Sequence, residues 1–316
     1  MMMRADLHVH TLHSTRSGNM RFLRSRDCYS RPIDVYRRAK SRGMDLVAIT
    51  DHDSIDGALE LAASVEHPEE VIIGEEVSCC HGDIQVHLGV YGMTEALHRD
   101  VQPLRRNVFD AIACLRSAGV LFSLNHLLHF YRGQTPLADY LRLLDEVPAL
   151  EARNGAMLPA HNLLIEAIVA RRTVNNDTVM SAIGGSDAHT LRRVGRTWTE
   201  APGRSRDEFL ESLKRGLGRP GGEHGDASTV AGDAYGVIRS YIGSLIGIGP
   251  RDHAGWHRAG CLTFSSVSLP FQFVPMAIAL KGKRREAATV RRVTAELNAA
   301  VASAPRRPVQ IEDAPW

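Results

Sequence analysis

Short apolar runs that alternate with helix-like stretches are the feature that most limits how this chain can fold. The runs are nearly continuous in aliphatic residues, as in MDLVAIT at 44–50, and this composition is typical of strands buried on both faces of a sheet. About seven strands wound with helices predict a mostly parallel sheet that closes into a barrel. We expect the strands at residues 5–9, 44–50, 71–78, 84–91, 120–124, 149–153, 181–185 and 197–200.

Helix signals fill most of the stretches between these runs. A proline stands near the start of the first helical stretch, where its missing N–H costs nothing. The strands at 71–78 and 84–91 are instead joined by a turn around His81-Gly82-Asp83. We expect helices at residues 32–42, 56–64, 101–118, 135–144 and 159–170.

The composition is that of an ordinary globular protein. Of 316 residues, 44% are hydrophobic and 23% charged, and the net charge is +2, so composition indicates no nucleic-acid partner. Five scattered cysteines without CxxC spacing argue against a disulfide scaffold and a structural zinc knuckle. No basic region followed by an apolar run opens the chain, which makes a cytoplasmic location the default expectation.

The composition of the sequence changes beyond residue 216, where the alternation of short apolar runs and helical stretches ends. We expect a helix over 230–248, then an apolar stretch at 262–280, the basic run KGKRR at 281–285 and an alanine-rich helix to about residue 302. The apolar stretch has the length of a membrane span. Two prolines and several polar residues interrupt it, so we expect a buried or partner-facing segment instead. Residues 1–225 thus form the chemical domain, and 226–316 form a mostly helical extension.

Histidines and acidic residues recur at the ends of the expected strands, where a parallel barrel gathers its functional side chains. His8 and His10 are two residues apart and therefore point to one face of their strand. Asp187 and His189 repeat this spacing in GGSDAH. The other candidates are Asp51, His52, Glu76, His87 and His126. Together they predict a metal site.

Two adjacent carboxylates, Glu75 and Glu76, lie on one expected strand. Adjacent strand residues face opposite sides, so one of the two points inward and needs a partner or a metal. The remaining histidines are expected either to be solvated, at His67, His98, His161, His253 and His257, or to approach a site through loops, at His13, His81, His129 and His224.

The motifs DLHVHT, ITDHDSIDG, GEEVS, VHLGVYG, NH and GGSDAH follow one another in this order. In that order they resemble the polymerase and histidinol phosphatase (PHP) superfamily, over about residues 5 to 225. The resemblance implies a distorted (β/α)7 TIM-like barrel that hydrolyses phosphoesters with two or three divalent metal ions.

The resemblance also implies how the ligands divide. One metal would be held by His8, His10, Glu76 and Asp187. Glu76 would bridge to a second metal, completed by His87 and His126. A third metal would take His52 and His189, with one more ligand from the loop after His10.

That loop departs from the family pattern. Many members have an aspartate, glutamate or histidine five or six residues past the second histidine, and this chain has Thr15 and Arg16 there. Whether a third metal binds is therefore open, unless His13 or Asp27 substitutes.

Mixed histidine and carboxylate ligands suit manganese, zinc or iron better than magnesium alone. The expected chemistry is attack on phosphorus by a hydroxide held between the metals. Asp51 is expected beside the ligands, where it would orient one of them. His52 or His189, if its metal is absent, could protonate the leaving oxygen.

Phosphate also needs positive charge from the protein, and arginine offers a planar fork that fits it. The candidates in the loop after His10 are Arg16 and Arg21, and those after later strands are Arg153 and Arg196. Arg153 ends a strand, and Asn154 beside it could donate a hydrogen bond to substrate.

The leading function is hydrolysis of a small phosphomonoester, such as a nucleotide or sugar phosphate. A phosphodiesterase or exonuclease acting on oligonucleotides is the first alternative, although no basic stripe with aromatic residues is present. A non-catalytic, metal-stabilised interaction domain is the second. A C–N hydrolase of similar architecture is disfavoured, because such enzymes commonly use a bridging lysine and none occurs between Lys40 and Lys214.

Overall fold

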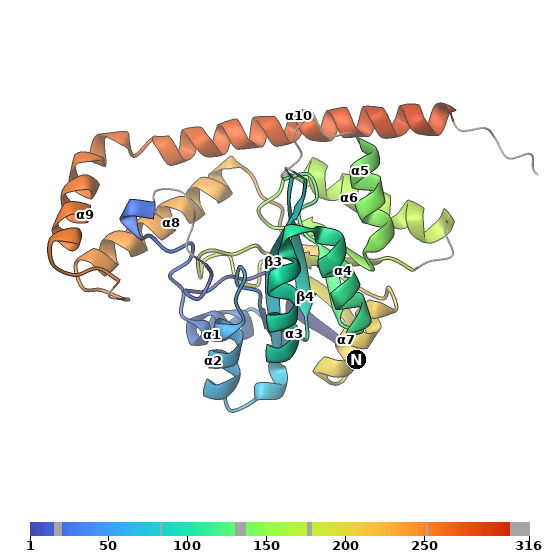
Figure 1. The fold of residues 1–316 in the computed structure, drawn as a ribbon, viewed down its shortest axis with the longest axis horizontal. Helices are drawn as coiled ribbons and strands as arrows, with labels where there is room; N and C mark the ends of the chain where they lie inside the picture. The colour runs from blue at the N-terminus through green and yellow to red at the C-terminus, as the bar shows by residue number, and fades with distance from the viewer. Residues whose placement is uncertain (16–20, 83, 130–136, 176–178, 251, 304–316) are drawn as a thin grey trace, which may run out of the picture.

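One nine-stranded sheet forms the centre of the protein in a computed structural model (Figure 1), which describes residues 1–15, 21–82, 84–129, 137–175, 179–250 and 252–303. The strand order is β7-β6-β5-β4-β3-β2-β1-β8-β9. The strands are β1 Met2–Asp6, β2 Leu46–Ile49, β3 Val71–His81, β4 Ile84–Tyr91, β5 Leu121–Leu124, β6 Ala149–Asn154, β7 Ser181–Gly185, β8 Thr197–Pro202 and β9 Arg219–Gly222. All the expected strands are present, and the α/β barrel prediction is confirmed.

The pairing departs from a purely parallel barrel at two strands. β1, β2 and β3 pair in parallel, as do β5, β6 and β7. β4 is antiparallel to both of its neighbours, because the tight turn after β3 reverses the chain. β8 likewise runs antiparallel to β1 and β9. The barrel is therefore distorted, and the residues of β4 reach the carboxyl-end edge from the strand's amino-terminal half.

The barrel is nearly closed between β1 and β7. Beyond β1, Val9 forms a parallel bridge with Ala188, and the His10 N–H donates to the Ala188 carbonyl at 3.1 Å. On the edge of β7 that does not pair with β6, the Thr199 hydroxyl of β8 accepts from the Gly184 N–H at 2.7 Å and lies 2.9 Å from the Gly184 carbonyl. These contacts bring the residues after β1 beside those after β7.

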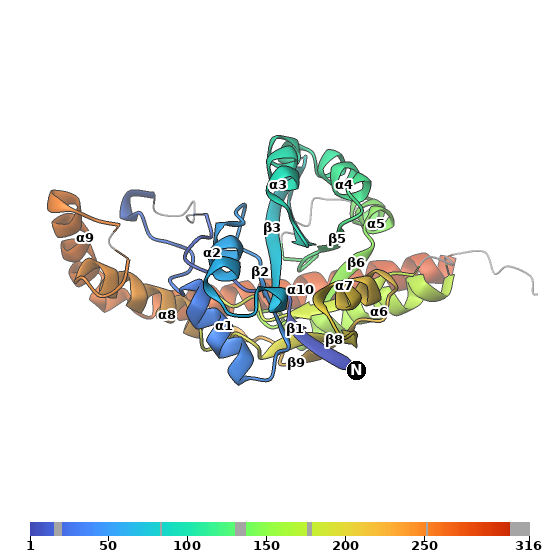
Figure 2. The same cartoon turned by 90° about the horizontal axis from the view of Figure 1, so that it is seen from below.

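Helices cover the outside of the sheet (Figure 2). Around the barrel they are α1 Pro32–Ser41, α2 Asp56–Ser64, α3 Glu95–Val101, α4 Val108–Ser117, α5 Leu137–Glu146, α6 Pro159–Asn175 and α7 Arg206–Lys214. The single helix expected over 101–118 is wrong. A 3-10 turn at Gln102–Arg106, which contains a proline, breaks it, and the side chain of Asn107 caps the start of α4.

An apolar layer fills the barrel beneath its carboxyl-end edge. Each of β1 to β8 contributes at least one buried residue to it, and Leu7, Leu46, Ile72, Tyr91 and Ile183 are among the members. Two further clusters pack the outer face of the sheet against the helices. Side chains rather than water therefore form the floor of the barrel.

The chain after residue 225 adds three long helices, α8 Ala227–Leu245, α9 Gly255–Val267 and α10 Val274–Ser303. α10 runs along one edge of the molecule, and α9 lies at its far end (Figure 1). Val290 and Val293 of α10 join the main hydrophobic cluster, so the extension packs onto the barrel. The division into domains at residue 225 stays a prediction.

The apolar stretch 262–280 spans the end of α9 and the start of α10. The expectation that it is buried is wrong, because Val267, Phe271, Phe273 and Ile278 are all more than half exposed. The partner-facing alternative stays a prediction. Within the part of the chain that the structure describes, no helix has the length and hydrophobicity to cross a bilayer.

Gly185 allows β7 to approach β1, which makes it a test of barrel closure. A Cβ at this position would lie 2.3 Å from His8 Cβ and 2.5 Å from the His8 backbone nitrogen. Gly185→Ala should therefore lower the free energy of unfolding by about 1–3 kcal/mol, measured by urea denaturation. Gly282→Ala, at an exposed position of α10 with no atom nearby, is the control and should raise it by about 0.5–1 kcal/mol. Equal stability of the two variants would contradict the close β1–β7 approach.

Candidate metal centre

The residues after β1 supply the first pair of ligands. His8 and His10 are both buried, and their Nε2 atoms lie 3.2 and 3.5 Å from Oε2 of Glu76. Each Nε2 also lies 3.5 Å from Oδ1 of Asp187, which follows β7. The structure thus brings together the four residues expected to hold one metal.

Glu76 on β3 stands between two groups of histidines. Its Oε2 faces His8 and His10 and also Nδ1 of His52 at 3.1 Å. Its Oε1 faces Nδ1 of His87 at 3.2 Å and Nε2 of His126 at 3.0 Å. A carboxylate with each oxygen directed at a different imidazole group has the geometry needed to bridge two ions.

The neighbouring carboxylate points the other way. Glu75 is buried on the opposite face of β3, where its carboxylate lies 2.8 Å from Nδ1 of His98 and accepts from Gln102 at 2.6 Å. The alternation expected of two adjacent strand residues is confirmed. His98, expected to be solvated, is instead the partner of this buried charge.

Asp27, on the long loop between β1 and α1, completes a third group. Its Oδ2 lies 2.8 Å from Nε2 of His189 and 3.6 Å from Nε2 of His52, and these three residues form a candidate metal-binding group with His10. His13 instead pairs with Glu60 on α2, at 2.7 Å. Of the two substitutes considered for the missing loop ligand, the structure therefore places Asp27 at the site.

Several buried atoms in these groups have no hydrogen-bond partner among the described residues. They are His8 Nε2, His10 Nε2, His52 Nδ1 and Glu76 Oε2. Buried polar atoms are normally satisfied, and leaving them unmet costs stability. The atoms converge within 4.8 Å of one another in overlapping groups of three or four nitrogen and oxygen ligands. The residues therefore fit divalent metal ions, which would satisfy these atoms.

A buried carboxylate that the sequence analysis did not identify holds the ligands in place. Glu151 on β6 lies 2.7 Å from Nδ1 of His8 and accepts from the His126 backbone N–H at 2.9 Å. Asn154 donates to Glu151 at 2.9 Å and to Asp187 at 3.2 Å. Asn154, expected to bind substrate, thus positions a ligand. The sequence feature that could have identified Glu151 is its position as a charged residue within a short apolar strand.

Asp51 lies next to the ligands, in contact with the loop after His10. Its carboxylate accepts from the Thr11 hydroxyl at 2.6 Å and from the Ser14 hydroxyl at 3.1 Å. Ser14 Oγ in turn lies 3.1 Å from Nδ1 of His10. Asp51 therefore orients His10 through Ser14, a connection of the kind that fixes the tautomer of a ligand.

The charges of the site act strongly on one another. Burial opposes a charged imidazole at His8, yet the adjacent carboxylates raise its pKa well above the usual range. Burial likewise opposes ionisation of Asp187, and the surrounding histidines still hold its pKa well below the usual range. At His189 burial is outweighed by Asp27, which raises the pKa to about 10. Without a metal, protons bound to His8 and His189 supply part of the positive charge that these carboxylates attract.

Two ligands occupy strained backbone conformations. His126 and Asp187 have φ angles of 28° and 51°, a left-handed region that non-glycine residues seldom adopt. Such strain persists only where the surroundings enforce it, and it clusters at functional sites.

The arginines expected to bind phosphate are not brought to the cluster by the structure. Arg153 forms an ion pair at 2.7 Å with Glu166 on α6, and Arg196 pairs with Glu223 at 2.6 Å. Arg16 and the side chain of Arg21 lie outside the described residues. The sequence shows Arg153 and Arg196 but not their carboxylate partners, which tertiary packing brings to them.

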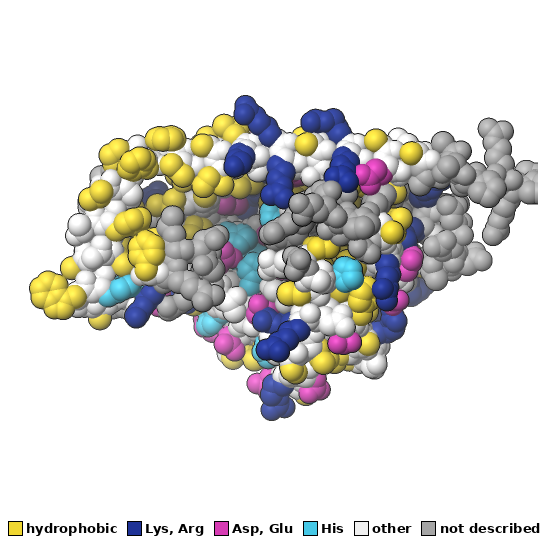
Figure 3. Space-filling view, turned by 45° about the horizontal axis from the view of Figure 1, so that its top comes forward, with side chains coloured by type: hydrophobic (Ala, Val, Ile, Leu, Met, Phe, Trp, Pro, Cys, Tyr) yellow, Lys and Arg dark blue, Asp and Glu magenta, His cyan; other side chains and the backbone are white. Residues whose placement is uncertain are grey.

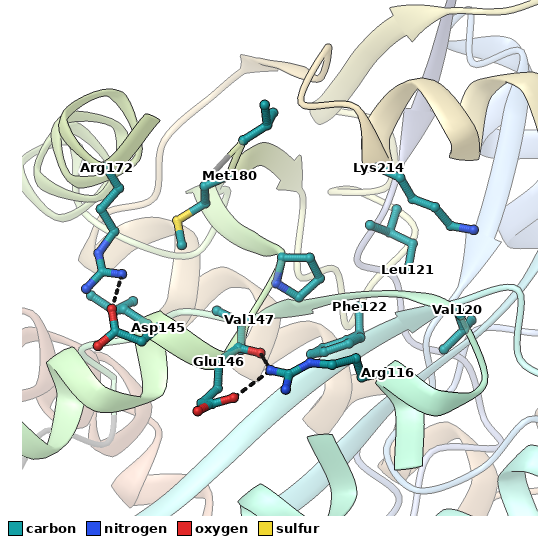
Figure 4. A pocket seen from close by; sticks show the side chains of 14 residues that line it. Arg116, Val120, Leu121, Phe122, Asp145, Glu146, Val147, Arg172, Met180 and Lys214 are labelled. Carbon is teal, nitrogen blue, oxygen red and sulfur yellow. Dashed lines mark hydrogen bonds and ion pairs between the residues drawn. The ribbon is translucent and has the colours of Figure 1, made fainter. Parts of the chain in front are cut away.

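The metal groups lie in a hollow on one face of the molecule. Figure 3 shows histidine side chains at its floor, with lysines and arginines of α10 along the edge above. A separate pocket of about 550 Å³ lies at the opposite end of the barrel, lined by the starts of β5, β6 and β7 (Figure 4). Its Arg116 and Arg172 form ion pairs with adjacent carboxylates. Because barrel chemistry occurs at the carboxyl ends, we assign the site to the hollow.

Glu76→Gln should reduce metal content by at least two ions per chain, because both of its oxygens face metal-binding groups. Glu75→Gln is the matched control, since it alters the adjacent buried carboxylate on the opposite face. Mass spectrometric metal analysis of the purified variants measures the difference. Full metal content in Glu76→Gln would rule out the bridging role.

Asp27→Asn should lower the metal content by one ion per chain relative to the wild type, whereas His13→Gln should leave the metal content unchanged. Binding of the Asp27-dependent ion should also release a proton at neutral pH, because His189 must lose the proton that its raised pKa retains. Its affinity should therefore increase as pH rises through the neutral range. Titration calorimetry in buffers of different ionisation enthalpy measures the release, and the absence of any buffer dependence would contradict it.

Residues 175–217 match the model of the PHP-associated family. An 83-residue segment is 39% identical to an uncharacterised protein of Methanocaldococcus jannaschii, covering 26% of this chain and 48% of that protein. The match thus spans about half the length of this curated relative.

The chain is similar to two solved structures, and the first of them shares its fold. PsfC of Pseudomonas syringae is 19% identical with a TM-score of 0.51, covering 76% of this chain and 98% of that one. A candidate metal-dependent phosphoesterase of Bifidobacterium adolescentis is 16% identical with a TM-score of 0.47, covering 67% and 95%. The matched PHP-associated segment, and the ordered ligand motifs at the carboxyl ends of a distorted barrel, are the features that make this chain similar to the polymerase and histidinol phosphatase superfamily.

Proposed function

We propose that this protein is a metal-dependent phosphoesterase that hydrolyses a small phosphomonoester, such as a nucleotide or sugar phosphate. The observation that carries the proposal is Glu76, whose two oxygens face separate histidine groups. Divalent ions bound in this way neutralise phosphate charge and lower the pKa of water. The mixed histidine and carboxylate donors suit manganese, zinc or iron.

The protein's own residues would position these ions and limit access to them. Glu151 and Asn154 hold His8, Asp187 and the backbone of His126 in place, and Asp51 orients His10 through Ser14. The apolar layer below closes the barrel interior. Among the described residues, the side of the ligand groups that this layer leaves open is the hollow at the carboxyl-end edge (Figure 3), from which substrate would approach.

Positive charge at the rim comes from the C-terminal extension. Lys283 of α10 donates to the Ala156 carbonyl, just beyond β6, and pairs with Glu286, which accepts from the Leu158 N–H at 2.6 Å. Lys281, Arg284 and Arg285 are exposed on the same helix. These exposed cations favour one second candidate, a phosphodiesterase acting on short oligonucleotides, because such substrates carry several phosphates.

A panel of phosphomonoesters and short oligonucleotides, assayed with added manganese, tests the proposal. We expect turnover of at least one phosphomonoester by the wild type and by Glu75→Gln, and loss of turnover to background in Glu76→Gln. Turnover of oligonucleotides alone would favour the second candidate. No turnover of any phosphoester by the fully metal-loaded protein would overturn both.

Glu151→Gln should lower activity by about 10- to 100-fold, the usual effect of losing a residue that orients a metal ligand. Arg153→Ala and Arg196→Ala should leave activity within about twofold of wild type, because both arginines are paired with carboxylates away from the ligands. Steady-state kinetics on the best substrate of the panel measure all three. A large loss in Arg153→Ala would restore that residue as a phosphate-binding group.

A further inference from the structure

A second cluster of metal-ligating side chains lies in the C-terminal extension. His253, His257 and Cys261 each offer one nitrogen or sulfur atom, and these atoms all lie within 4.8 Å of one another. Along a straight helix the first and last of them would be about 12 Å apart. His253 instead precedes α9, and Gly255 adopts a left-handed φ of 52°. The resulting turn folds His253 back over the first turns of the helix.

Two backbone carbonyls determine which nitrogen of each ring carries the proton. His253 Nε2 lies 2.8 Å from the Leu23 carbonyl, and His257 Nε2 lies 2.8 Å from the Phe22 carbonyl. A carbonyl oxygen can only accept, so each Nε2 carries the hydrogen and each Nδ1 keeps its lone pair. Histidines that bind metals usually donate their other ring N–H to such a group.

The sulfur lies at a suitable separation and in suitable surroundings. Cys261 Sγ is 3.9 Å from Nδ1 and 3.8 Å from Nε2 of His257, so it lies beside the ring at a similar distance from both nitrogens. These separations are close to the ~3.6 Å between a sulfur and a nitrogen bound to one tetrahedral zinc, and Nε2 already faces the Phe22 carbonyl. Cys261 is buried in a small cluster with Leu23, Tyr241 and Leu245. The cluster contains a soft ligand with two imidazoles, a donor set that favours zinc over magnesium or calcium.

We propose that Nδ1 of His253, Nδ1 of His257 and Sγ of Cys261 bind one zinc ion, separate from the barrel centre. The barrel groups consist of histidines and carboxylates, whereas this one contains a cysteine. The site does not depend on the proposed phosphoesterase activity.

The zinc site would anchor the loop that brings Asp27 to the barrel centre. Phe22 and Leu23 accept from the two histidines, and Arg26 forms a bidentate ion pair with Asp252 at 2.6 Å for both contacts. Asp27 is the next residue, and it faces His189. Zinc bound at the start of α9 would thus stabilise the loop that carries Asp27, the residue that completes the third candidate metal group of the barrel.

Cobalt substitution tests the site in the full-length chain. Cobalt bound to a thiolate gives a charge-transfer band in the near ultraviolet, and the barrel groups contain no thiolate. We expect the band in the wild type, in Glu76→Gln and in Cys114→Ser, a cysteine control on α4. Cys261→Ser and His257→Gln should lose it. No band in the wild type, or a band that persists in Cys261→Ser, would overturn the proposal.

Zinc content gives a second readout that does not depend on spectroscopy. Wild type and Cys114→Ser should hold one zinc per chain more than Cys261→Ser, and hydrogen exchange at residues 22–27 should be faster in Cys261→Ser. Circular dichroism checks that the variant is folded, and His257→Gln replaces it if it is not. Equal zinc content in the wild type and the folded variant would overturn the proposal.

Discussion

The buried carboxylate of Glu76 and the five imidazoles around it form the interaction on which the rest of the structure depends. A charge in the interior is costly unless it is paired, and here His8, His10, His52, His87 and His126 surround it. Protons on those rings can compensate the charge only in part, because cationic histidines packed together repel one another. Divalent ions held by these residues would provide the compensation that this arrangement needs, and the same ions would supply the chemistry proposed for it.

The barrel explains why these side chains meet. Its strands run so that chain segments far apart in sequence end at one edge, and the bridge between Val9 and Ala188 aligns the two most distant of them. Because β4 runs antiparallel to its neighbours, His87 in the amino-terminal half of β4 lies at the same edge as these segments. Glu151 then fixes the orientation of ligands from two further elements. The positions of the ligands are thus a property of the closed sheet, and a change such as an added Cβ at Gly185 would be felt at the site.

Much of this could be predicted from the sequence, because it is encoded by local patterns. Apolar runs located the buried strands, and the two-residue spacing of His8 with His10 placed both side chains on one face. The edge strand β9 was missed because its sequence RPGG lacks strand propensity, and proline is tolerated only at an edge. Asp27 and Glu151 depend on which distant segments meet. The partners of Arg153 and Arg196 likewise follow from tertiary packing, which no spacing rule reports.

The C-terminal extension contributes residues and contacts to the site in addition to those of the barrel. α10 packs its valines onto the main core and presents cations above the hollow (Figure 3), while α9 holds the loop that carries Asp27.

Anomalous scattering from crystals grown with manganese would most directly test the claim that Glu76 bridges two metal ions. The account predicts separate anomalous peaks on the two sides of the Glu76 carboxylate, one toward His8 and His10 and one toward His87 and His126. A map with no peak beside Glu76, at full manganese occupancy elsewhere, would contradict it.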